Sequence, residues 1–178
     1  MTFLPYMRIK QQQMVNKMLE FKDRPYRPCA GICLMNKAKH IFVGQRIDSS
    51  QDAWQMPQGG IDEGETTFKA ALREMLEEIG TDKAHLVAEL AKPLDYDLPA
   101  DLADKMWHGQ YRGQRQYWFL MQFTGTNNDI NLATEHPEFS AYKWVSPQKL
   151  PSLAISFKRD IYQSIITEFA PYFTIEQA

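Results

Sequence analysis

Three glutamates, Glu74, Glu77 and Glu78, are crowded within about one turn and a half of a predicted helix. Each helical residue turns about 100° from the last, so the three carboxylates fall within roughly 100° of one another, opposite an apolar arc. Like charges at this spacing repel by a few tenths of a kcal/mol, which indicates a positive partner. Oxygen ligands at this density suit a hard dication such as Mg²⁺ or Mn²⁺, and no neighbouring Cys or His suggests zinc.

The residues around this cluster predict a helix from Phe68 to Ile79. Its apolar arc, roughly 140° wide, comprises Phe68, Ala71, Leu72, Met75, Leu76 and Ile79. Thr66 is a suitable N-cap and Gly80 a suitable C-cap for this segment. Because the arc lies opposite the carboxylates, we expect the apolar side of the helix to pack on the protein and the acidic side to face a ligand.

Residues before and within the helix can orient these carboxylates. Arg73 lies one turn before Glu77 and can pair with it. Glu65 sits just ahead of the positive end of the helix. The Gly59-Gly60 pair, read as a turn, lets the backbone approach a ligand closely.

The segment from Gly59 to Thr81, GGIDEGETTFKAALREMLEEIGT, resembles the Nudix box, the signature of the Nudix hydrolases. The match comprises Gly59, Glu65 and the run from Arg73 to Gly80, and it departs at Thr81, where an aliphatic residue is usual. The resemblance implies a Nudix-type α/β/α sandwich with a mixed β-sheet, an α/β or α+β fold in which the box forms a loop-helix-loop. It also implies that Mg²⁺ or Mn²⁺ is held by Gly59, Glu74, Glu77 and Glu78, with structural roles for Glu65, Arg73 and Gly80.

The sequence leaves two kinds of candidate for the general base. In Nudix enzymes the role falls to a glutamate of the box or to a glutamate from a later loop. Glu138, just before a predicted strand, is the best candidate outside the box, both for catalysis and as a further metal ligand, and Glu135 is the weaker alternative. The simpler interpretation of Glu138 is an ordinary exposed carboxylate. The catalytic candidates are therefore Glu74, Glu77, Glu78 and Glu138.

Motifs outside the box resemble one branch of this family, the bacterial RNA pyrophosphohydrolases, also called (di)nucleoside polyphosphate hydrolases. They extend over about Arg24 to Phe173 and include Tyr26-Arg27-Pro28, Trp54 to Gly60, Gly113 to Phe119, Pro137 to Phe139, Trp144 to Ser146 and Ser156 to Tyr162. The resemblance implies removal of pyrophosphate from the 5′-triphosphate end of RNA, a step in mRNA decay, and cleavage of dinucleoside polyphosphates. One position departs, because Ala53 stands where the branch tends to place a hydroxyl.

Basic, aromatic and amide side chains can serve such a substrate, which combines a base with a long phosphate chain. Arg27, Arg46 and Lys158 can meet phosphates. Phe157 can stack a base, which is worth roughly 1–3 kcal/mol and tolerates any base, and Gln114 can contact the RNA end. The simpler interpretation makes Phe157 a core residue and Lys158 a solvated charge.

Composition and charge fit a single globular domain. The chain has 178 residues, of which 44% are hydrophobic, and its formal net charge of −2 excludes a general basic surface for duplex nucleic acid. It has neither an apolar run long enough for a transmembrane helix nor the apolar core of a secretory signal, so we expect no membrane partner. Cys29 and Cys33 are read as buried, reduced thiols of a cytoplasmic protein.

The pattern divides the chain into an N-terminal extension, residues 1–23, and a Nudix domain, residues 24–178. The extension is read as either a short helix or disordered. In the domain, strands are predicted at 29–36 and 40–45, which form a hairpin, and at 54–57, 86–92, 115–124 and 139–145, with a loop at 47–52 and a helix at 156–169. Residues 94–98 are read as an extension of the fourth strand. The oligomeric state is open, and these features are compatible with a monomer.

The sequence therefore predicts metal-dependent hydrolysis of phosphoanhydride bonds. The expected substrates are 5′-triphosphorylated RNA, which would be left with a 5′-monophosphate, and dinucleoside polyphosphates. One alternative is a hydrolase of small nucleoside diphosphate compounds, such as ADP-ribose, or of dNTPs. Another is a non-catalytic module that binds nucleotides or RNA. The flanking motifs argue against the first alternative, and the complete set of box carboxylates argues against the second.

Overall fold

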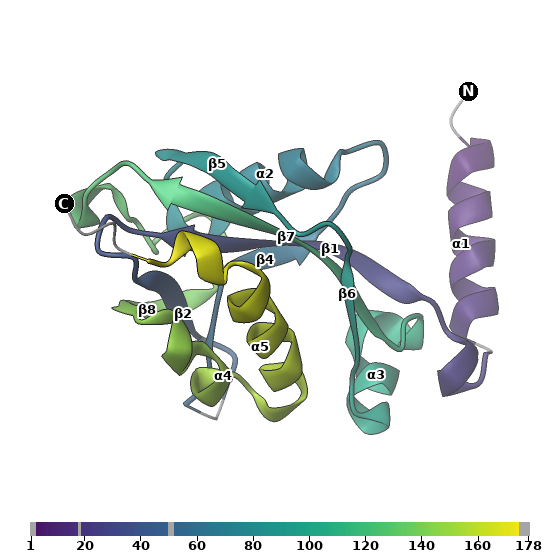
Figure 1. Cartoon of the computed structure of the whole chain (residues 1–178). Helices are drawn as coiled ribbons and strands as arrows, with labels where there is room; N and C mark the ends of the chain where they lie inside the picture. The colour runs from purple at the N-terminus through teal and green to yellow at the C-terminus, as the bar shows by residue number, and fades with distance from the viewer. Residues whose placement is uncertain (1–2, 18, 50–51, 175–178) are drawn as a thin grey trace.

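Strand β1 (Tyr26–Met35) lies in the middle of a mixed eight-stranded sheet (Figure 1). From Cys29 onward all its residues are buried, as expected of a continuous apolar run covered on both faces. Strand β7 (Gly113–Phe123) runs parallel to β1 over ten paired positions. The structure is a computed structural model that describes residues 3–17, 19–49 and 52–174.

The other strands complete the sheet in the order β3-β2-β1-β7-β5, and β4, β6 and β8 pair with β1, β7 and β2, respectively. Their bounds are Ile41–Arg46 (β2), Trp54–Gln55 (β3), Gln58–Gly60 (β4), Ala84–Glu89 (β5), Leu94–Asp97 (β6) and Phe139–Val145 (β8). Strands β5 and β6 lie antiparallel to opposite ends of β7, and β4 lies antiparallel to residues 29–31 of β1. This pairing brings the two glycines of β4 next to the central strand.

Helices cover both faces of this sheet. The α-helices are α1 (Phe3–Lys17), α2 (Thr67–Ile79), α3 (Ala100–Lys105), α4 (Leu150–Leu153) and α5 (Arg159–Glu168). Short 3-10 helices are η1 (Phe21–Asp23), η2 (Met106–Gly109), η3 (Asn127–Asp129), η4 (Pro147–Lys149), η5 (Ser156–Lys158) and η6 (Ala170–Tyr172). Alternate residues of β1 pack under α2 and under α5, so these two helices lie on opposite faces (Figure 1). The predicted α/β/α sandwich with a mixed sheet is confirmed.

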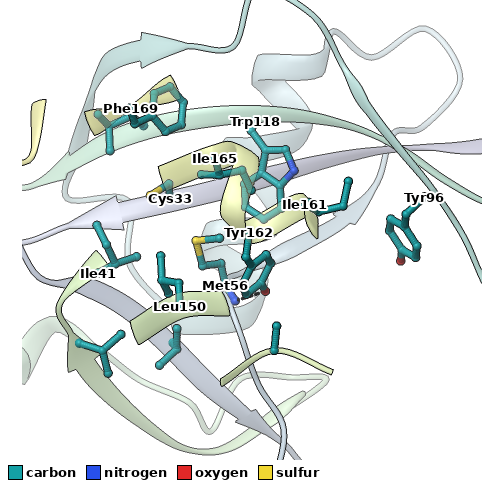
Figure 2. Packing of buried hydrophobic residues seen from close by; sticks show 14 of the residues in the cluster. Cys33, Ile41, Met56, Tyr96, Trp118, Leu150, Ile161, Tyr162, Ile165 and Phe169 are labelled. Carbon is teal, nitrogen blue, oxygen red and sulfur yellow. Dashed lines mark hydrogen bonds between the residues drawn. The ribbon is translucent and has the colours of Figure 1, made fainter. Parts of the chain in front are cut away.

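The core beneath α5 is built around an aromatic pair (Figure 2). Trp118 of β7 and Tyr162 of α5 meet edge to face, with ring centroids 6.1 Å apart. Such a pair is worth about 0.5–1.5 kcal/mol beyond the area it buries. The Tyr162 hydroxyl also accepts a hydrogen bond of 2.8 Å from the backbone N–H of Met56. This bond ties α5 to the segment between β3 and β4.

Several elements differ from the sequence-based expectation. Gly59 and Gly60, expected in a turn, belong to strand β4. Residues 94–98, expected to extend the preceding strand, instead form β6, which pairs with its own stretch of β7. The expected hairpin of the first two strands is reduced to the single pair Met35 and Ile41, because on this edge β2 goes on to pair with β3, and residues 29–31 of β1 pair with β4.

The N-terminal extension takes the helical one of its two expected forms. Helix α1 stands beside the sheet in Figure 1, and Phe21 of η1 packs at the edge of the core beneath α5. Residues 1–2 and 18 of the extension, residues 50–51 of the expected loop and residues 175–178 lie outside the described residues. No helix in the described ranges is both long and apolar enough to span a membrane.

Candidate active site

Helix α2 begins and ends where the sequence predicts. The Thr66 hydroxyl accepts a hydrogen bond of 3.3 Å from the N–H of Lys69, and Gly80 ends the helix in the left-handed conformation, with a φ of 71°. A Cβ at Gly80 would also lie 2.6 Å from the carbonyl oxygen of Asn131. Both caps are confirmed, and they fix the length of the helix that carries the glutamates.

The buried side of α2 contains most of the predicted apolar arc but is wider than the sequence predicts. It includes Glu74 and Glu78, which are 8% and 1% exposed, whereas Leu76 is 51% exposed. The expectation that Leu76 packs inward while the glutamates all face outward is therefore wrong, and Glu77 alone of the three is exposed. The physical reason is that strand β4 packs against the carboxylate side of the helix.

The glycines of β4 make room for side chains of this site. A Cβ at Gly59 would lie 1.9 Å from the carboxyl carbon of Glu74. A Cβ at Gly60 would lie 2.1 Å from Nη2 of Arg27. The sequence predicts that these glycines let the backbone approach a ligand closely. In this structure the groups that the glycines approach are side chains of the protein itself, Glu74 and Arg27.

Arg73 links the loop before α2 to the helix. Its guanidinium donates two hydrogen bonds to the carboxylate of Glu65, at 3.0 and 2.9 Å, and one of 2.8 Å to the carbonyl of Gly60. It also contacts Glu74 at 2.7 Å and Glu77 at 3.4 Å. The hydrogen bonds from Arg73, and a further one from a backbone N–H, lower the pKa of Glu65 to about 2. Arg73 therefore orients Glu65 and two of the three clustered glutamates of α2, Glu74 and Glu77.

Glu78 is the most deeply buried carboxylate of the cluster. Its Oε2 accepts a hydrogen bond of 3.1 Å from the backbone N–H of Gln58, while its Oε1 has no partner among the described residues. Burial raises the pKa of Glu78 well above the ordinary glutamate value, and the nearby carboxylates of Glu138 and Glu74 raise it further. Burial also raises the pKa of Glu74. The site therefore holds negative charge that a cation would stabilise.

Arg46 lies between Glu138 and Asp48, a carboxylate that sequence reasoning missed. It donates to the two carboxylate oxygens of Asp48, at 2.6 and 2.5 Å, and reaches Oε2 of Glu138 at 3.5 Å. A cavity of about 450 Å³ here is lined by Arg46, Ile47, Asp48, Glu135, His136, Pro137 and Glu138. Both candidate bases outside the box thus border one cavity, and Arg46, predicted to meet a phosphate, is engaged with carboxylates.

The glutamates predicted to bind a metal ion lie near one another, and in this structure they interact with other side chains of the protein. Arg73 pairs with Glu74 and Glu77, while Glu78 faces Glu138. Across residues 3–17, 19–49 and 52–174, no three acidic, His or Cys side chains are close enough together to hold one ion as they stand. The donor set nevertheless fits a hard divalent cation, because it consists of carboxylate oxygens, one of which is buried without a partner.

A second cluster lies beside η5, and Tyr96 is its centre. The ring of Phe157 stacks on that of Tyr96, with centroids 5.8 Å apart, and Nζ of Lys158 lies 5.8 Å from the centre of the same Tyr96 ring. The Tyr96 hydroxyl donates a hydrogen bond of 2.8 Å to Oε1 of Gln114. Three predicted substrate-binding residues therefore meet at one tyrosine, which sequence reasoning missed.

Gln58 and Arg27 join the two clusters. The backbone N–H of Gln58 donates to Oε2 of Glu78, and the side chain of Gln58 donates to Oε1 of Gln114 at 3.2 Å. Arg27 lies against Gly60 and over the ring of Trp107, 5.2 Å from its centre. Trp107 has a φ of 48°, a left-handed conformation that large side chains rarely adopt. The predicted substrate-binding residues thus lie next to the carboxylates.

Lys158 is buried, so its interpretation as a solvated charge is wrong. It is 7% exposed, and its Nζ donates to Oε1 of Gln55 at 3.3 Å. Burial, and after it the positive charge of Arg46, lowers the pKa of Lys158 to about 8. Phe157 is half-buried and belongs to the 3-10 helix η5 rather than to α5.

We expect Lys158→Met to stabilise the protein and to raise the KM for substrate. Because the lysine pKa is lowered on folding, the buried ammonium costs free energy below about pH 8, and this cost disappears as the pH rises toward the unfolded value of 10.5. At roughly 1.4 kcal/mol for each pKa unit, the gain near neutral pH is of order 3 kcal/mol. Denaturant unfolding of both proteins between neutral pH and the unfolded pKa measures the difference, which should shrink as the pH rises.

Lys149→Met is the matched control for this prediction, because Lys149 is exposed. Its effect on the free energy of unfolding should stay within about 0.5 kcal/mol. A Lys158→Met variant that is no more stable than the wild type near neutral pH would contradict the assignment of a buried, costly charge.

The chain matches a protein-family model described as NUDIX domain over residues 25–165. It is 52% identical over 156 residues to an RNA pyrophosphohydrolase of Rickettsia canadensis (strain McKiel), an alignment that covers 88% of this chain and 97% of that protein. It is 51% identical, with the same coverage, to an RNA pyrophosphohydrolase of Rickettsia rickettsii (strain Sheila Smith).

Solved structures share the fold at lower identity. The E. coli dihydroneopterin triphosphate pyrophosphohydrolase aligns with a TM-score of 0.61 at 22% identity, covering 82% of this chain and 99% of that chain. A C. elegans Ap4A hydrolase binary complex aligns with a TM-score of 0.57 at 17% identity, covering 80% and 98% of the two chains. At these identities the likeness concerns the fold alone.

Proposed function

This chain belongs to the Nudix family, in its branch of RNA pyrophosphohydrolases, and from this premise we propose that it removes pyrophosphate from the 5′-triphosphate end of RNA. It is a hydrolase that acts on pyrophosphate bonds. The observation that carries the proposal is that the buried carboxylates of Glu74 and Glu78 lie beside the second cluster, formed by Tyr96, Gln114, Phe157 and Lys158, with Arg27 between the two. A nucleotide has the two matching parts, a phosphate chain and a base that can stack.

The carboxylate cluster supports the use of a divalent cation, Mg²⁺ or Mn²⁺. The oxygen donors that would hold it are Glu74, Glu77, Glu78, Glu138 and the backbone carbonyl of Gly59. Such an ion neutralises phosphate charge and lowers the pKa of water when bound. Arg73 keeps two of these carboxylates in place through hydrogen bonds, and the free Oε1 of Glu78 is available to a ligand.

Glu138 is our candidate for the group that takes the proton from the attacking water. Glu74 and Glu77 are paired with Arg73, whose hydrogen bonds occupy one carboxylate oxygen of each. Glu138 is held more loosely, by Arg46 at 3.5 Å, and its side chain is 42% exposed at the edge of the cavity. It can therefore receive a proton beside Glu78 and pass it to solvent.

The same arrangement supports the cleavage of dinucleoside polyphosphates as a second activity. These compounds also contain a base and a long phosphate chain, and stacking on Phe157 does not depend on which base is present. The reaction is again the hydrolysis of a phosphoanhydride bond. We place both activities in the cytoplasm, an assignment that the free, buried thiols of Cys29 and Cys33 support.

A product assay tests the proposal. The purified protein is incubated with Mg²⁺ and with 5′-triphosphorylated RNA, diadenosine polyphosphates, ADP-ribose and dNTPs in parallel. We expect pyrophosphate and 5′-monophosphate RNA from the first substrate, at a higher kcat/KM than for the mononucleotides. Faster hydrolysis of ADP-ribose or dNTPs would replace this proposal with the small-substrate alternative, and no hydrolysis of any substrate would support a binding module.

Glu77→Gln is expected to lower kcat by two orders of magnitude or more while leaving the fold intact. Glu77 is exposed and its ion pair with Arg73 is long, at 3.4 Å, so the free energy of unfolding should change by less than about 1 kcal/mol. Glu63→Gln is the matched control, since Glu63 is an exposed carboxylate of the preceding loop without an assigned role. If the two variants hydrolysed triphosphorylated RNA equally well, Glu77 would have no part in catalysis.

A further inference from the structure

Buried polar side chains form a row of hydrogen bonds next to the second cluster. Trp118, Gln116 and Gln114 alternate along β7 and so lie on the same face of the sheet. The indole N–H of Trp118 donates to Oε1 of Gln116 at 3.1 Å. Nε2 of Gln116 then donates to Oε1 of Gln58 and to Oε1 of Gln114, both at 2.9 Å. We call Trp118, Gln116, Gln58 and Gln114 the amide row.

The direction of the amide row is fixed by its first member. An indole N–H can only donate, so Oε1 of Gln116 must face Trp118 and its Nε2 must face the other two amides. A flip of any of the three amides would place a donor against a donor. Oε1 of Gln114 is filled by three donors, because Gln58 and the Tyr96 hydroxyl also donate to it. Its Nε2 has no acceptor among the described residues.

This free amide nitrogen belongs to the part of the fold where the substrate is expected. Gln114 is paired with Arg27 across strands β1 and β7. The Tyr96 hydroxyl donates a hydrogen bond to the side-chain oxygen of Gln114. The ring of Tyr96 stacks on Phe157 and lies near the ammonium group of Lys158. An NH₂ group in this place can donate a hydrogen bond and cannot accept one.

We propose that the amide row makes Gln114 a hydrogen-bond donor to the first nucleotide of the substrate, with Trp118 and Gln116 as positioning residues that act through it. The group recognised is an acceptor atom, either a phosphate oxygen or an acceptor on the base. This proposal rests on the proposed function and deepens it. An amide that is free to flip can pair with either a donor or an acceptor of the ligand. A fixed NH₂ group pairs only with an acceptor, so a ligand that places a donor here is disfavoured because that donor stays unpaired.

A double-mutant cycle between Gln116 and Gln114 tests the positioning role. Gln116→Met keeps the length of the side chain but removes the N–H groups that hold Gln114, and we expect the KM for triphosphorylated RNA to rise about tenfold, the size of one lost hydrogen bond, with kcat within about threefold. In a Gln114→Met background the same change should alter KM by less than twofold, because the amide it positions is gone. An equal rise in KM in both backgrounds would overturn the proposal.

Tyr96→Phe provides a second, milder variant in case Gln116→Met unfolds. It removes one of the three donors to Gln114 and keeps the ring that stacks on Phe157. Its effect on KM should likewise be smaller in the Gln114→Met background than in the wild type. An effect of the same size in both backgrounds would mean that the tyrosine does not act through Gln114.

A spectroscopic measurement separates this inference from the proposed function. In ¹⁵N-labelled wild-type protein, the side-chain NH₂ signals of Gln114, assigned by their loss in Gln114→Met, should shift on titration with a non-hydrolysable guanosine triphosphate analogue, and those of Gln116 should shift less. Binding seen elsewhere in the site without a shift of Gln114 would overturn the inference and leave the hydrolase assignment intact. Comparing RNA that begins with guanosine or 7-deazaguanosine then tests one acceptor atom, because a rise in KM assigns the acceptor to N7 of the base and an unchanged KM excludes N7.

Discussion

Glu78→Gln should lower the rate of hydrolysis by orders of magnitude and at the same time make the metal-free protein more stable near neutral pH. In the wild type, Oε1 of Glu78 is buried without a hydrogen-bond partner among the described residues, and the carboxylate of Glu138 lies near that of Glu78. Glutamine keeps the oxygen that accepts from Gln58 and replaces the unpaired oxygen with an NH₂ group that can donate to Glu138. Removing a buried, poorly paired carboxylate should add of order 1–3 kcal/mol to the free energy of unfolding.

The pH dependence of this gain has a definite sign. The pKa of Glu78 is raised on folding, so the folded protein binds this proton more tightly than the unfolded chain. The stabilising contribution of protonated Glu78 is full below the unfolded value of 4.5 and is lost as the pH rises through the raised folded value. The wild type and Glu78→Gln should therefore have similar stability at acidic pH, and the variant should become the more stable one as the pH increases.

Two measurements on the same samples check this prediction. Denaturant unfolding with a chelator present, from acidic to neutral pH, gives the stability difference, and pyrophosphate release with Mg²⁺ gives the rate. We expect kcat to fall by about three orders of magnitude if Glu78 holds the cation. Glu77→Gln, at the exposed neighbour, should lower the rate without the gain in stability. A Glu78→Gln protein with wild-type kcat would remove this residue from the site.

Gly59→Ala is the second change from which we expect a large effect. The added methyl group would lie 1.9 Å from the carboxyl carbon of Glu74, so the carboxylate has to leave its place. Because the end of a glutamate side chain can rotate, the consequence should appear mainly in activity. Displacement of a group by about 1 Å can lower the rate a hundredfold, and we expect a loss of this order in kcat.

Gly64→Ala is the matched control for Gly59→Ala. Gly64 lies in the same loop-helix-loop segment, has a φ of 80° and has nothing within 4 Å of an added Cβ. The change should therefore cost about 1 kcal/mol of stability through backbone strain and leave kcat close to the wild-type value. If Gly64→Ala lowered kcat as much as Gly59→Ala, the effect at Gly59 would reflect general disturbance of the segment rather than displacement of Glu74.

The sequence predicts those features that depend on neighbours along the chain. The caps of α2, the apolar strands and the layered fold follow from local spacing, and Thr66 and Gly80 lie where that spacing requires. The burial of α2 depends on more than these neighbours. Helical periodicity identifies an apolar arc but says nothing of β4, whose contact with the helix turns Glu74 and Glu78 inward and leaves Leu76 exposed.

Residues that complete the candidate site could not be found from local spacing because their partners are far away in the chain. The alternation around Tyr96 predicts a half-buried strand, yet its contacts with Gln114 and Phe157 depend on how β6, β7 and η5 meet. In the sequence, Asp48 looks like an ordinary acidic residue of a loop, and only the structure shows that Arg46 binds its carboxylate. Metal binding by the box glutamates and substrate contacts by Arg27 and Lys158 stay predictions.

The long separation between β1 and its parallel neighbour has a consequence for synthesis on the ribosome. Tyr26 pairs with Gly113, so a nascent chain releases β1, β4 and the glutamates of α2 well before β7 exists. Until then the apolar edge of β1 stays open, and neither Gln114 nor Glu138 is present. Such intermediates expose unpaired strand edges and fold slowly, so we expect chains truncated before Gly113 to aggregate or to depend on chaperones.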